Sequence, residues 1–221
     1  MEVILLRHGK TAADAGLFGR TDAKVPAARQ QAIADALFAQ HDDVELIVSS
    51  PLSRCHELAE LLGQQHDWPI RLQADLQEMD FGLLDGVPFA TQDYPWPLLN
   101  AFWQDPANAS LPKGETLAEF QQRVVQCWSQ IISTEHRKVL IITHGGVIRL
   151  ILAHLLGVDW QRPHWYQTLA IENASLTHIT IFTDSDQTQF PTVKMIGMPL
   201  SIREEQQIIQ SISHRFIRNT E

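Results

Sequence analysis

The sequence is poor in cysteine and in positive charge, and each shortage excludes a class of protein. Only two cysteines occur in 221 residues, Cys55 and Cys127, both at apolar positions of expected helices. Two cysteines cannot form a disulfide framework, although one disulfide stays open. Lysine and arginine total 17 against 26 acidic residues, for a net charge of −9. Such an acidic surface argues against nucleic acid and anionic membranes as partners.

Long apolar runs and metal-binding spacings are also missing. The first apolar run, residues 3–6, is far too short for a signal peptide or a membrane span. We therefore expect a cytoplasmic protein with no membrane partner. The ten histidines have no HExxH or CxxC companion, so we predict no metal and no other cofactor.

Short apolar runs alternate with helical patterns along most of the chain. Runs at residues 3–6, 46–48 and 139–142 predict buried strands, and later runs at 176–182 and 192–196 predict two more. This alternation predicts an α/β fold, a three-layer sandwich with a mostly parallel central sheet and helices on both faces.

Punctuation residues predict where helices begin and end. We expect Ser50 to be an N-cap with Pro51 in the first turn, and the helix that follows to stop at Gly63. A second helix, over residues 147–156, should end at Gly157.

A region rich in proline and aromatic residues interrupts this pattern at about residues 85–113. We expect a cap-like insertion over the end of the sheet, inside one domain spanning residues 1–221. A capping box at residues 116–119 then begins a helix. Its apolar face contains Leu117, Phe120, Val124, Cys127 and Ile131.

The C-terminus carries a second capping box, at residues 201–204, which predicts a helical tail over about residues 201–219. Its apolar stripe contains Ile202, Ile209, Ile212 and Phe216. Such a stripe can cover the chain's own sheet or pair with a second copy, so a homodimer is a possible assembly.

Two histidines stand where predicted strands end. His8 follows the first strand, with Arg7 before it and Gly9 after it, and His144 follows the strand at residues 139–142. Ligands of open α/β sheets bind beyond the carboxyl ends of the strands. The two histidines could therefore share one pocket, and Arg7 suggests an anionic substrate.

Six ordered segments resemble the motifs of the histidine phosphatase superfamily, also called the phosphoglycerate-mutase-like family. They are residues 7–11, 19–22, 49–54, 76–82, 112–116 and 143–146. One departure stands out, because Asp14 occupies a position where the family usually has a phosphate-holding asparagine. A carboxylate repels phosphate unless it is protonated, paired or turned away, so a contact from Asp14 is in doubt.

The resemblance implies a division of labour among the motif residues. His8 would attack phosphorus, and Glu78 would protonate the leaving oxygen and then activate water. The phosphoryl oxygens would be held by Arg7, Arg54 and His144, with contacts from Gly9, Thr11 and Gly145.

The residue types suit these roles. A histidine nucleophile must be neutral, and fixed cations stabilise the charge that develops on a transferring phosphoryl group. Asp80 and Asp85 are the carboxylates that compete with Glu78 for the acid–base role.

Three functions compete: a phosphatase, a phosphoglycerate mutase and a non-catalytic protein of the same fold. A mutase needs additional cations around its substrate, yet Lys113 is the one basic residue between Met79 and Gly114. The core motif residues are all present, which disfavours a non-catalytic protein. The small-molecule partner should therefore be a phosphate ester that the enzyme hydrolyses.

Within the superfamily, residues 19–22, the chain length and the motif order are most similar to the α-ribazole phosphatases. That resemblance implies hydrolysis of α-ribazole 5′-phosphate in cobalamin nucleotide-loop assembly. A flat base could stack on Trp96, Phe102 or Trp103, although these side chains could equally form the insertion's own core. The alternative is a phosphatase of broad specificity or of sugar phosphates.

Overall fold

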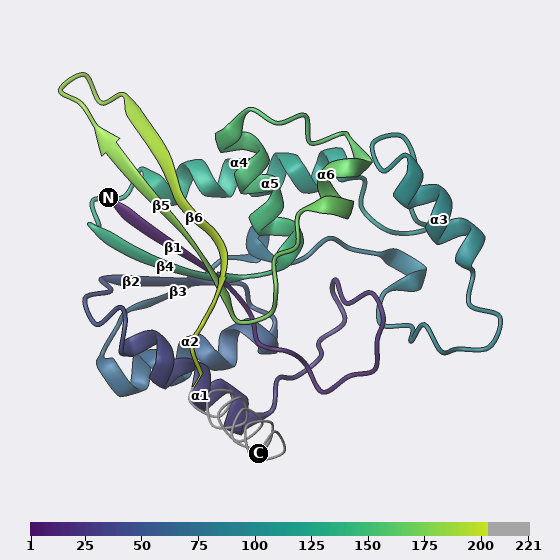
Figure 1. Cartoon of the computed structure of the whole chain (residues 1–221), viewed down its shortest axis with the longest axis horizontal. Coiled ribbons are helices and arrows are strands. Elements are labelled where there is room, and N and C mark those ends of the chain that lie inside the picture. Colours follow the sequence, from purple (N-terminus) through teal and green to yellow (C-terminus); the bar gives the residue numbers. More distant parts are fainter. Residues whose placement is uncertain (203–221) are drawn as a thin grey trace, which may run out of the picture.

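One six-stranded sheet forms the centre of the protein, in a computed structural model that describes residues 1–202 (Figure 1). The strand order is β3-β2-β4-β1-β5-β6. The strands are β1 (Glu2–Arg7), β2 (Leu46–Ser49), β3 (Ile70–Leu72), β4 (Lys138–Thr143), β5 (Ser175–Thr183) and β6 (Gln189–Pro199). The first four are mutually parallel, whereas β5 pairs antiparallel with both β1 and β6. The predicted mostly parallel sheet is confirmed.

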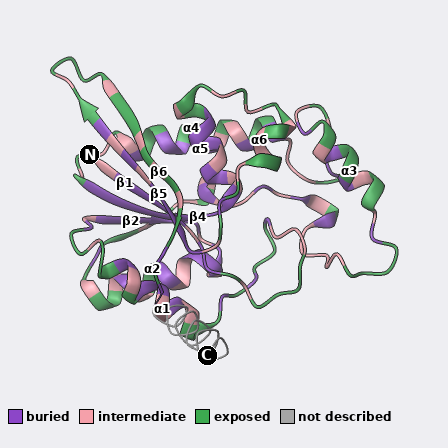
Figure 2. Ribbon diagram, in the orientation of Figure 1, coloured by how far each residue is buried: buried purple, intermediate pink, exposed green. Residues whose placement is uncertain are grey.

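Helices cover both faces of this sheet (Figure 1). One layer holds α1 (Ala27–Phe38) and α2 (Ser53–His66), and the other holds α4 (Leu117–Ile132) and α5 (Gly145–Leu156). Along β1, Ile4 and Leu6 join the core beneath α1 and α2, whereas Val3 and Leu5 join the core beneath α4 and α5. A strand buried on both faces needs an unbroken apolar run. Consistent with this, β2 and β4 are buried along their whole length and β1 is buried at all but its two end residues (Figure 2).

Two predicted ends of α2 are wrong. The helix begins at Ser53, with Leu52 as its N-cap, rather than after Ser50. Gly63 does not end the helix, which continues to His66 and stops where Asp67 adopts a left-handed φ of 56°. A Cβ at Gly63 would lie 2.6 Å from Ile70 Cδ1. Glycine at this position therefore allows β3 to approach the helix and does not mark its terminus.

Other predicted helix ends are confirmed. Thr116 and Glu119 form the capping box that begins α4, and Gly157 ends α5 with a φ of 64°. The α4 side chains that were predicted to form an apolar face are all buried: Leu117, Phe120, Val124, Cys127 and Ile131.

The region after β3 passes through two short 3-10 turns, η1 (Ala74–Leu76) and η2 (Gly82–Leu84), before α3 (Trp96–Gln104). In Figure 1, α3 lies beyond the carboxyl ends of the central strands. A short helix, α6 (Pro163–Thr168), follows α5. The predicted tail helix at 201–219 lies, from residue 203 onward, outside the described residues, so the homodimer stays a prediction. Within residues 1–202, no helix is long and apolar enough to cross a membrane.

Candidate active site

The ends of β1 and β4 bring the two strand-end histidines together. The strands are parallel neighbours in which Arg7 pairs with Thr143, so His8 and His144 leave the sheet side by side. Their ring centroids are 5.1 Å apart. His8 retains 8% exposure, whereas His144 is fully buried. The outer ring can therefore meet a ligand while the inner ring lies behind it.

His8 has the form that a nucleophile needs. Its Nδ1 lies 2.8 Å from the carbonyl oxygen of Gly9. A carbonyl only accepts hydrogen bonds, so this contact assigns the ring proton to Nδ1 and leaves a lone pair on Nε2. Burial, together with the charges of Arg54 and Arg7, lowers the pKa of His8 to about 3. The imidazole is therefore neutral at physiological pH.

Arg54 is fully buried and is held mainly by protein acceptors. Its Nε donates to His144 Nδ1 at 3.1 Å, and its terminal nitrogens donate to the carbonyls of Thr21, Phe18 and Gly19 at 2.9, 2.9 and 2.7 Å. These four bonds leave one of the five guanidinium hydrogens without a protein acceptor. Arg54 thus also anchors the loop at residues 18–21.

His144 is oriented by the same arginine. Because its Nδ1 accepts from Arg54, its Nε2 carries the proton and faces Ser50 Oγ at 2.8 Å. Burial and the neighbouring charges of His8, Arg54 and Arg7 lower the pKa of His144 well below its usual value. Ser50 therefore supports His144 and does not cap α2, and nothing in the sequence signalled that contact.

Arg7 presents a buried nitrogen to the site. Its Nη1 donates to the carbonyl of Ile171, whereas its Nε is buried without a hydrogen-bond partner. A Cβ placed on Gly145 would lie 3.5 Å from that Nε. An unpaired buried donor is costly, and an anion bound beside it would satisfy it.

A cavity of about 550 Å³ opens in front of His8. Its lining includes Arg7, Lys10, Thr11 and Asp14. Asp14, whose contact with phosphate was in doubt from the sequence, therefore lies at this cavity. Gly9 does not line it, and a Cβ there would lie 2.7 Å from Ile33 Cδ1. Gly9 therefore allows close packing against α1, while its carbonyl accepts from His8.

Asn173 also lines this cavity, and its Nδ2 donates to the carbonyl of His8 at 3.1 Å. Asn173 precedes β5 and belongs to none of the motifs, so it was not among the predicted site residues.

Glu78 stands between this cavity and a second one of about 280 Å³, and it lines both. Its Oε1 accepts from the Met79 amide at 3.1 Å and its Oε2 from the Gly146 amide at 3.0 Å. Asp80 and Asp85 line neither cavity. Their carboxylates accept backbone amides instead, Asp80 from Gly82 and Asp85 from Arg20, Thr21 and Phe81. The geometry therefore favours Glu78 among the three carboxyl groups.

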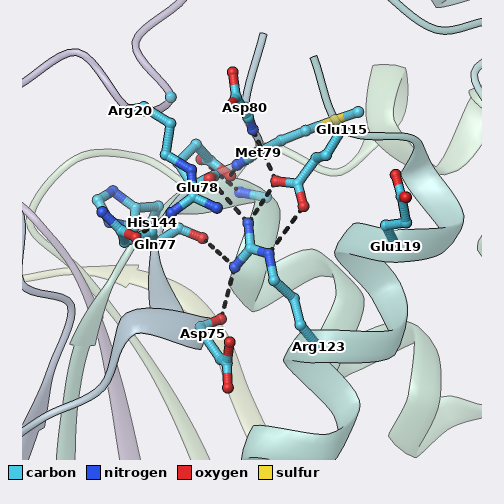
Figure 3. A network of polar contacts seen from close by, with 12 residues as sticks. Arg20, Asp75, Gln77, Glu78, Met79, Asp80, Glu115, Glu119, Arg123 and His144 are labelled. Atoms are coloured by element: carbon cyan, nitrogen blue, oxygen red, sulfur yellow. Dashed lines mark hydrogen bonds and ion pairs between the residues drawn. The ribbon is translucent and has the colours of Figure 1, made fainter. Parts of the chain in front are cut away.

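Arg123, on α4, fixes the backbone that carries Glu78 (Figure 3). Its guanidinium donates to the carbonyls of Asp75, Gln77 and Glu78 at 2.7, 2.8 and 3.0 Å. It also makes a two-pronged ion pair with Glu115 at 2.6 and 2.9 Å. Arg123 was not among the predicted site residues, because it lies on α4 outside every motif, but it contacts the 76–82 segment directly.

Five aromatic side chains line the second cavity. They include Phe102 and Trp103 of α3, two of the residues offered by the sequence for contact with the substrate. The other three are Phe81, Phe120 and Tyr166. Trp96 does not line it. That side chain packs on Phe89 and Tyr94, with ring centroids 5.3 and 4.8 Å away.

Arg149, on α5, also lines the second cavity. It was not among the predicted site residues, because it lies outside the insertion in which cations were sought. Arg149 lies one helical turn after Gly145, a spacing that places both on one face of the helix. Among residues 1–202, no group of three or more histidine, cysteine, aspartate or glutamate side chains could hold a metal ion.

Comparisons with known proteins agree on one family. The model of the histidine phosphatase superfamily (branch 1) matches residues 3–192. A 2-carboxy-D-arabinitol-1-phosphatase from Triticum aestivum is 26% identical over 86% of this chain, which spans only 39% of that protein. A glucosyl-3-phosphoglycerate phosphatase from Mycolicibacterium vanbaalenii is 27% identical over 83% of this chain and 86% of its own length. The fold is like that of the α-ribazole phosphatase from Shigella flexneri, with a TM-score of 0.74 at 21% identity, covering 91% and 99% of the two chains.

Proposed function

The chain belongs to the histidine phosphatase superfamily, and on that premise we propose that it hydrolyses small phosphate monoesters through a phosphohistidine at His8. The observation that carries the proposal is the pairing of a neutral His8 ring, whose Nε2 is free, with a carboxyl group at Glu78 that borders the same cavity. A nucleophile and an acid on one cavity are the two groups that this chemistry requires.

The reaction has two steps. In the first, Nε2 of His8 attacks phosphorus, the bond from phosphorus to the ester oxygen breaks, and protonated Glu78 gives its proton to the departing alcohol. In the second, Glu78 takes a proton from water, which attacks the phosphohistidine and releases inorganic phosphate and free His8. Arg7 Nε and the remaining N–H of Arg54 offer charge to the phosphoryl oxygens.

Release of phosphate from p-nitrophenyl phosphate tests the proposal, with His8→Ala beside the wild type. We expect the substitution to remove turnover by roughly 10⁴-fold, as loss of a nucleophile does. The matched control is His154→Ala, which removes an exposed histidine on α5. Circular dichroism checks that both variants fold. Wild-type levels of turnover in His8→Ala would remove the nucleophile assignment. The wild-type rate should also survive EDTA, because no step uses a metal.

The finer prediction, hydrolysis of α-ribazole 5′-phosphate in cobalamin nucleotide-loop assembly, rests on the motif resemblance and on the aromatic second cavity. Phe102 and Trp103 line that cavity, which supports stacking of a base. The fold likeness to the Shigella enzyme carries no substrate information at 21% identity.

The alternative, a phosphatase of broader specificity or of sugar phosphates, is supported by one observation. Trp96 lies away from both cavities, so only two of the three aromatic residues that the sequence offered for stacking, Phe102 and Trp103, line the second cavity. Relative kcat/KM for α-ribazole 5′-phosphate, a sugar phosphate and p-nitrophenyl phosphate separates the two. A preference of about a hundredfold for the first, equivalent to ~3 kcal/mol, would support the named substrate. Similar values would support broad specificity.

A further inference from the structure

Arg149 is a cation in a cavity that offers it no ion pair. The lining of the second cavity is Glu78, Met79, Phe81, Phe102, Trp103, Pro106, Leu117, Phe120, Gly146, Arg149 and Tyr166. Arg149 is the only basic side chain in that set. The hydroxyl of Tyr166 is already committed to the carbonyl of Trp160 at 2.8 Å. A ligand's polar group in this cavity would therefore meet Arg149 or Glu78.

The guanidinium of Arg149 is fixed in place but not satisfied. Its Nε donates to the Leu169 carbonyl at 2.7 Å, and its own carbonyl accepts from Trp165 Nε1 at 3.1 Å. Within residues 1–202, its two terminal nitrogens make no hydrogen bond or ion pair. Burial lowers the pKa of Arg149, while the negative charges of Glu78 and Glu172 act in the other direction. These nitrogens are not among the buried atoms that lack a partner, so they are open to solvent or to a ligand, and an anion could form charge-assisted hydrogen bonds with them.

A second cation lies close by. A Cβ on Gly145 would be 3.4 Å from Arg149 Nη1 and 3.5 Å from Arg7 Nε, so the two guanidinium groups flank the same glycine. They face different cavities, however. Arg7 lines the cavity in front of His8, and Arg149 lines the aromatic one. The phosphoryl group belongs to the first cavity, so Arg149 faces whatever lies on the leaving-group side of Glu78.

The protonation of Glu78 during the reaction increases the net positive charge at Arg149's end of the cavity. Glu78 must be protonated to release the alcohol, and in that form it no longer opposes the positive charge of Arg149. The Oε2 atom of Glu78 accepts from Gly146, which lies three residues before Arg149 on α5. Three residues advance about 4.5 Å along a helix. Glu78 and Arg149 line the same cavity, so a negative group on the leaving-group side of the ester oxygen would face Arg149.

We infer that Arg149 forms a carboxylate subsite, so that the enzyme prefers phosphate esters of small hydroxy acids over neutral alcohols of the same size. This inference rests on the proposed phosphatase function and names its substrate class. The planar fork of arginine suits a carboxylate, and the aromatic wall at Phe102 and Trp103 holds the carbon skeleton. α-Ribazole 5′-phosphate has no carboxylate, so this assignment and that substrate make opposite predictions.

The test uses two esters that differ only in the group at issue. 3-Phosphoglycerate carries a carboxylate where glycerol 3-phosphate carries a hydroxymethyl group. We expect the wild type to favour 3-phosphoglycerate in kcat/KM by roughly tenfold to a hundredfold, the range for a charged hydrogen-bonded pair. Arg149→Met should abolish that preference, and Arg149→Lys should keep part of it. Arg137→Met removes an equal charge at an exposed position, and should leave the preference intact.

Each outcome decides between the claims. Three results would overturn the subsite. The first is an equal wild-type kcat/KM for the two esters, and the second is a preference that Arg149→Met retains. The third is an equal loss of kcat/KM on both esters in Arg149→Met. The last result would instead assign Arg149 to the phosphoryl group. If Arg149→Met fails to fold, the wild-type pair of esters and Arg149→Lys still decide. Wild-type turnover of p-nitrophenyl phosphate is the separate readout, and its absence would overturn the phosphatase proposal itself. Monitoring the 3-phosphoglycerate reaction by NMR distinguishes phosphate release from isomerisation to 2-phosphoglycerate.

Discussion

At Glu78, one carboxyl oxygen faces the amide of Met79 and the other faces that of Gly146. A Cβ on residue 146 would lie 2.2 Å from Glu78 Oε1, so only glycine permits this approach. Glycine is therefore required at position 146 because of the contact with Glu78, which lies 68 residues earlier in the chain. The first turn of α5 therefore holds the carboxyl group of Glu78.

Glu78→Gln tests the acid role at this residue. The glutamine oxygen can still accept from one of the Met79 and Gly146 amides, but the side chain cannot protonate an alcohol. We expect hydrolysis of glycerol 3-phosphate to fall by about 10²- to 10⁴-fold, and that of p-nitrophenyl phosphate to fall far less, because nitrophenolate leaves without a proton. Asp80→Asn is the matched control and should leave the ratio of the two rates unchanged. Equal losses on both esters in Glu78→Gln would contradict the assignment.

At the scale of elements, α4 controls the loop that delivers Glu78. Arg123 reaches from the middle of this helix to three carbonyls between residues 75 and 78 and to Glu115 (Figure 3). The Arg123 and Glu115 side chains are only 15% and 13% exposed. This ion pair is therefore screened far less than a surface pair, and its loss leaves a charge without its partner.

Arg123→Met should lower the free energy of unfolding by about 3 kcal/mol, because it leaves Glu115 and three carbonyls without their donor. As a positioning residue, Arg123 should affect kcat on alcohol esters more than KM, and p-nitrophenyl phosphate less than either. Arg137→Met, at a side chain that is 90% exposed, is the control. Urea unfolding and steady-state kinetics measure the two effects. A lower stability with an unchanged kcat would mean that Arg123 supports the fold alone.

Elements were predictable to different degrees. The strands and the pairing of His8 with His144 followed from apolar runs and strand ends, because parallel neighbours deliver their carboxyl ends to one edge. The start of α2 did not follow from the sequence. Ser50 had the chemistry of a cap, but its hydroxyl contacts His144, which is 94 residues away. Arg149 and Asn173 were also missed, since each reaches the site through contacts distant in sequence.

At the scale of the whole molecule, the active site is a source of sensitivity to acid. His8 and His144 are buried as neutral rings, and both pKa values are lowered in the folded state. A histidine of this kind contributes stability that is complete above its unfolded pKa of about 6.5. That contribution is lost as the pH falls toward the folded value, about 3 for His8, because the unfolded chain binds the proton first.

We therefore expect the free energy of unfolding to fall below pH 6.5 by about 1.4 kcal/mol per pH unit for each of the two histidines. Between pH 6.5 and pH 5 this is roughly 2 kcal/mol for His8 alone. Urea unfolding at pH 7 and pH 5 measures the change. In His8→Gln, the slope of the unfolding free energy against pH should be smaller by the amount that corresponds to one proton. His154→Gln, at an exposed position, should leave that slope unchanged. Equal slopes in wild type and His8→Gln would contradict a neutral, buried His8.

Cys55 lies beneath the same site, with its sulfur 3.7 Å from His144 Nε2. Burial raises the pKa of Cys55 to about 12 and that of Cys127 to about 11. The reactive form of a thiol is the thiolate, which neither residue can form in the folded protein at neutral pH. Iodoacetamide should therefore leave the native enzyme active and alkylate both cysteines only after unfolding. The labelling rate of Cys55 would then report how often the packing behind the histidine pair opens, with no substrate present.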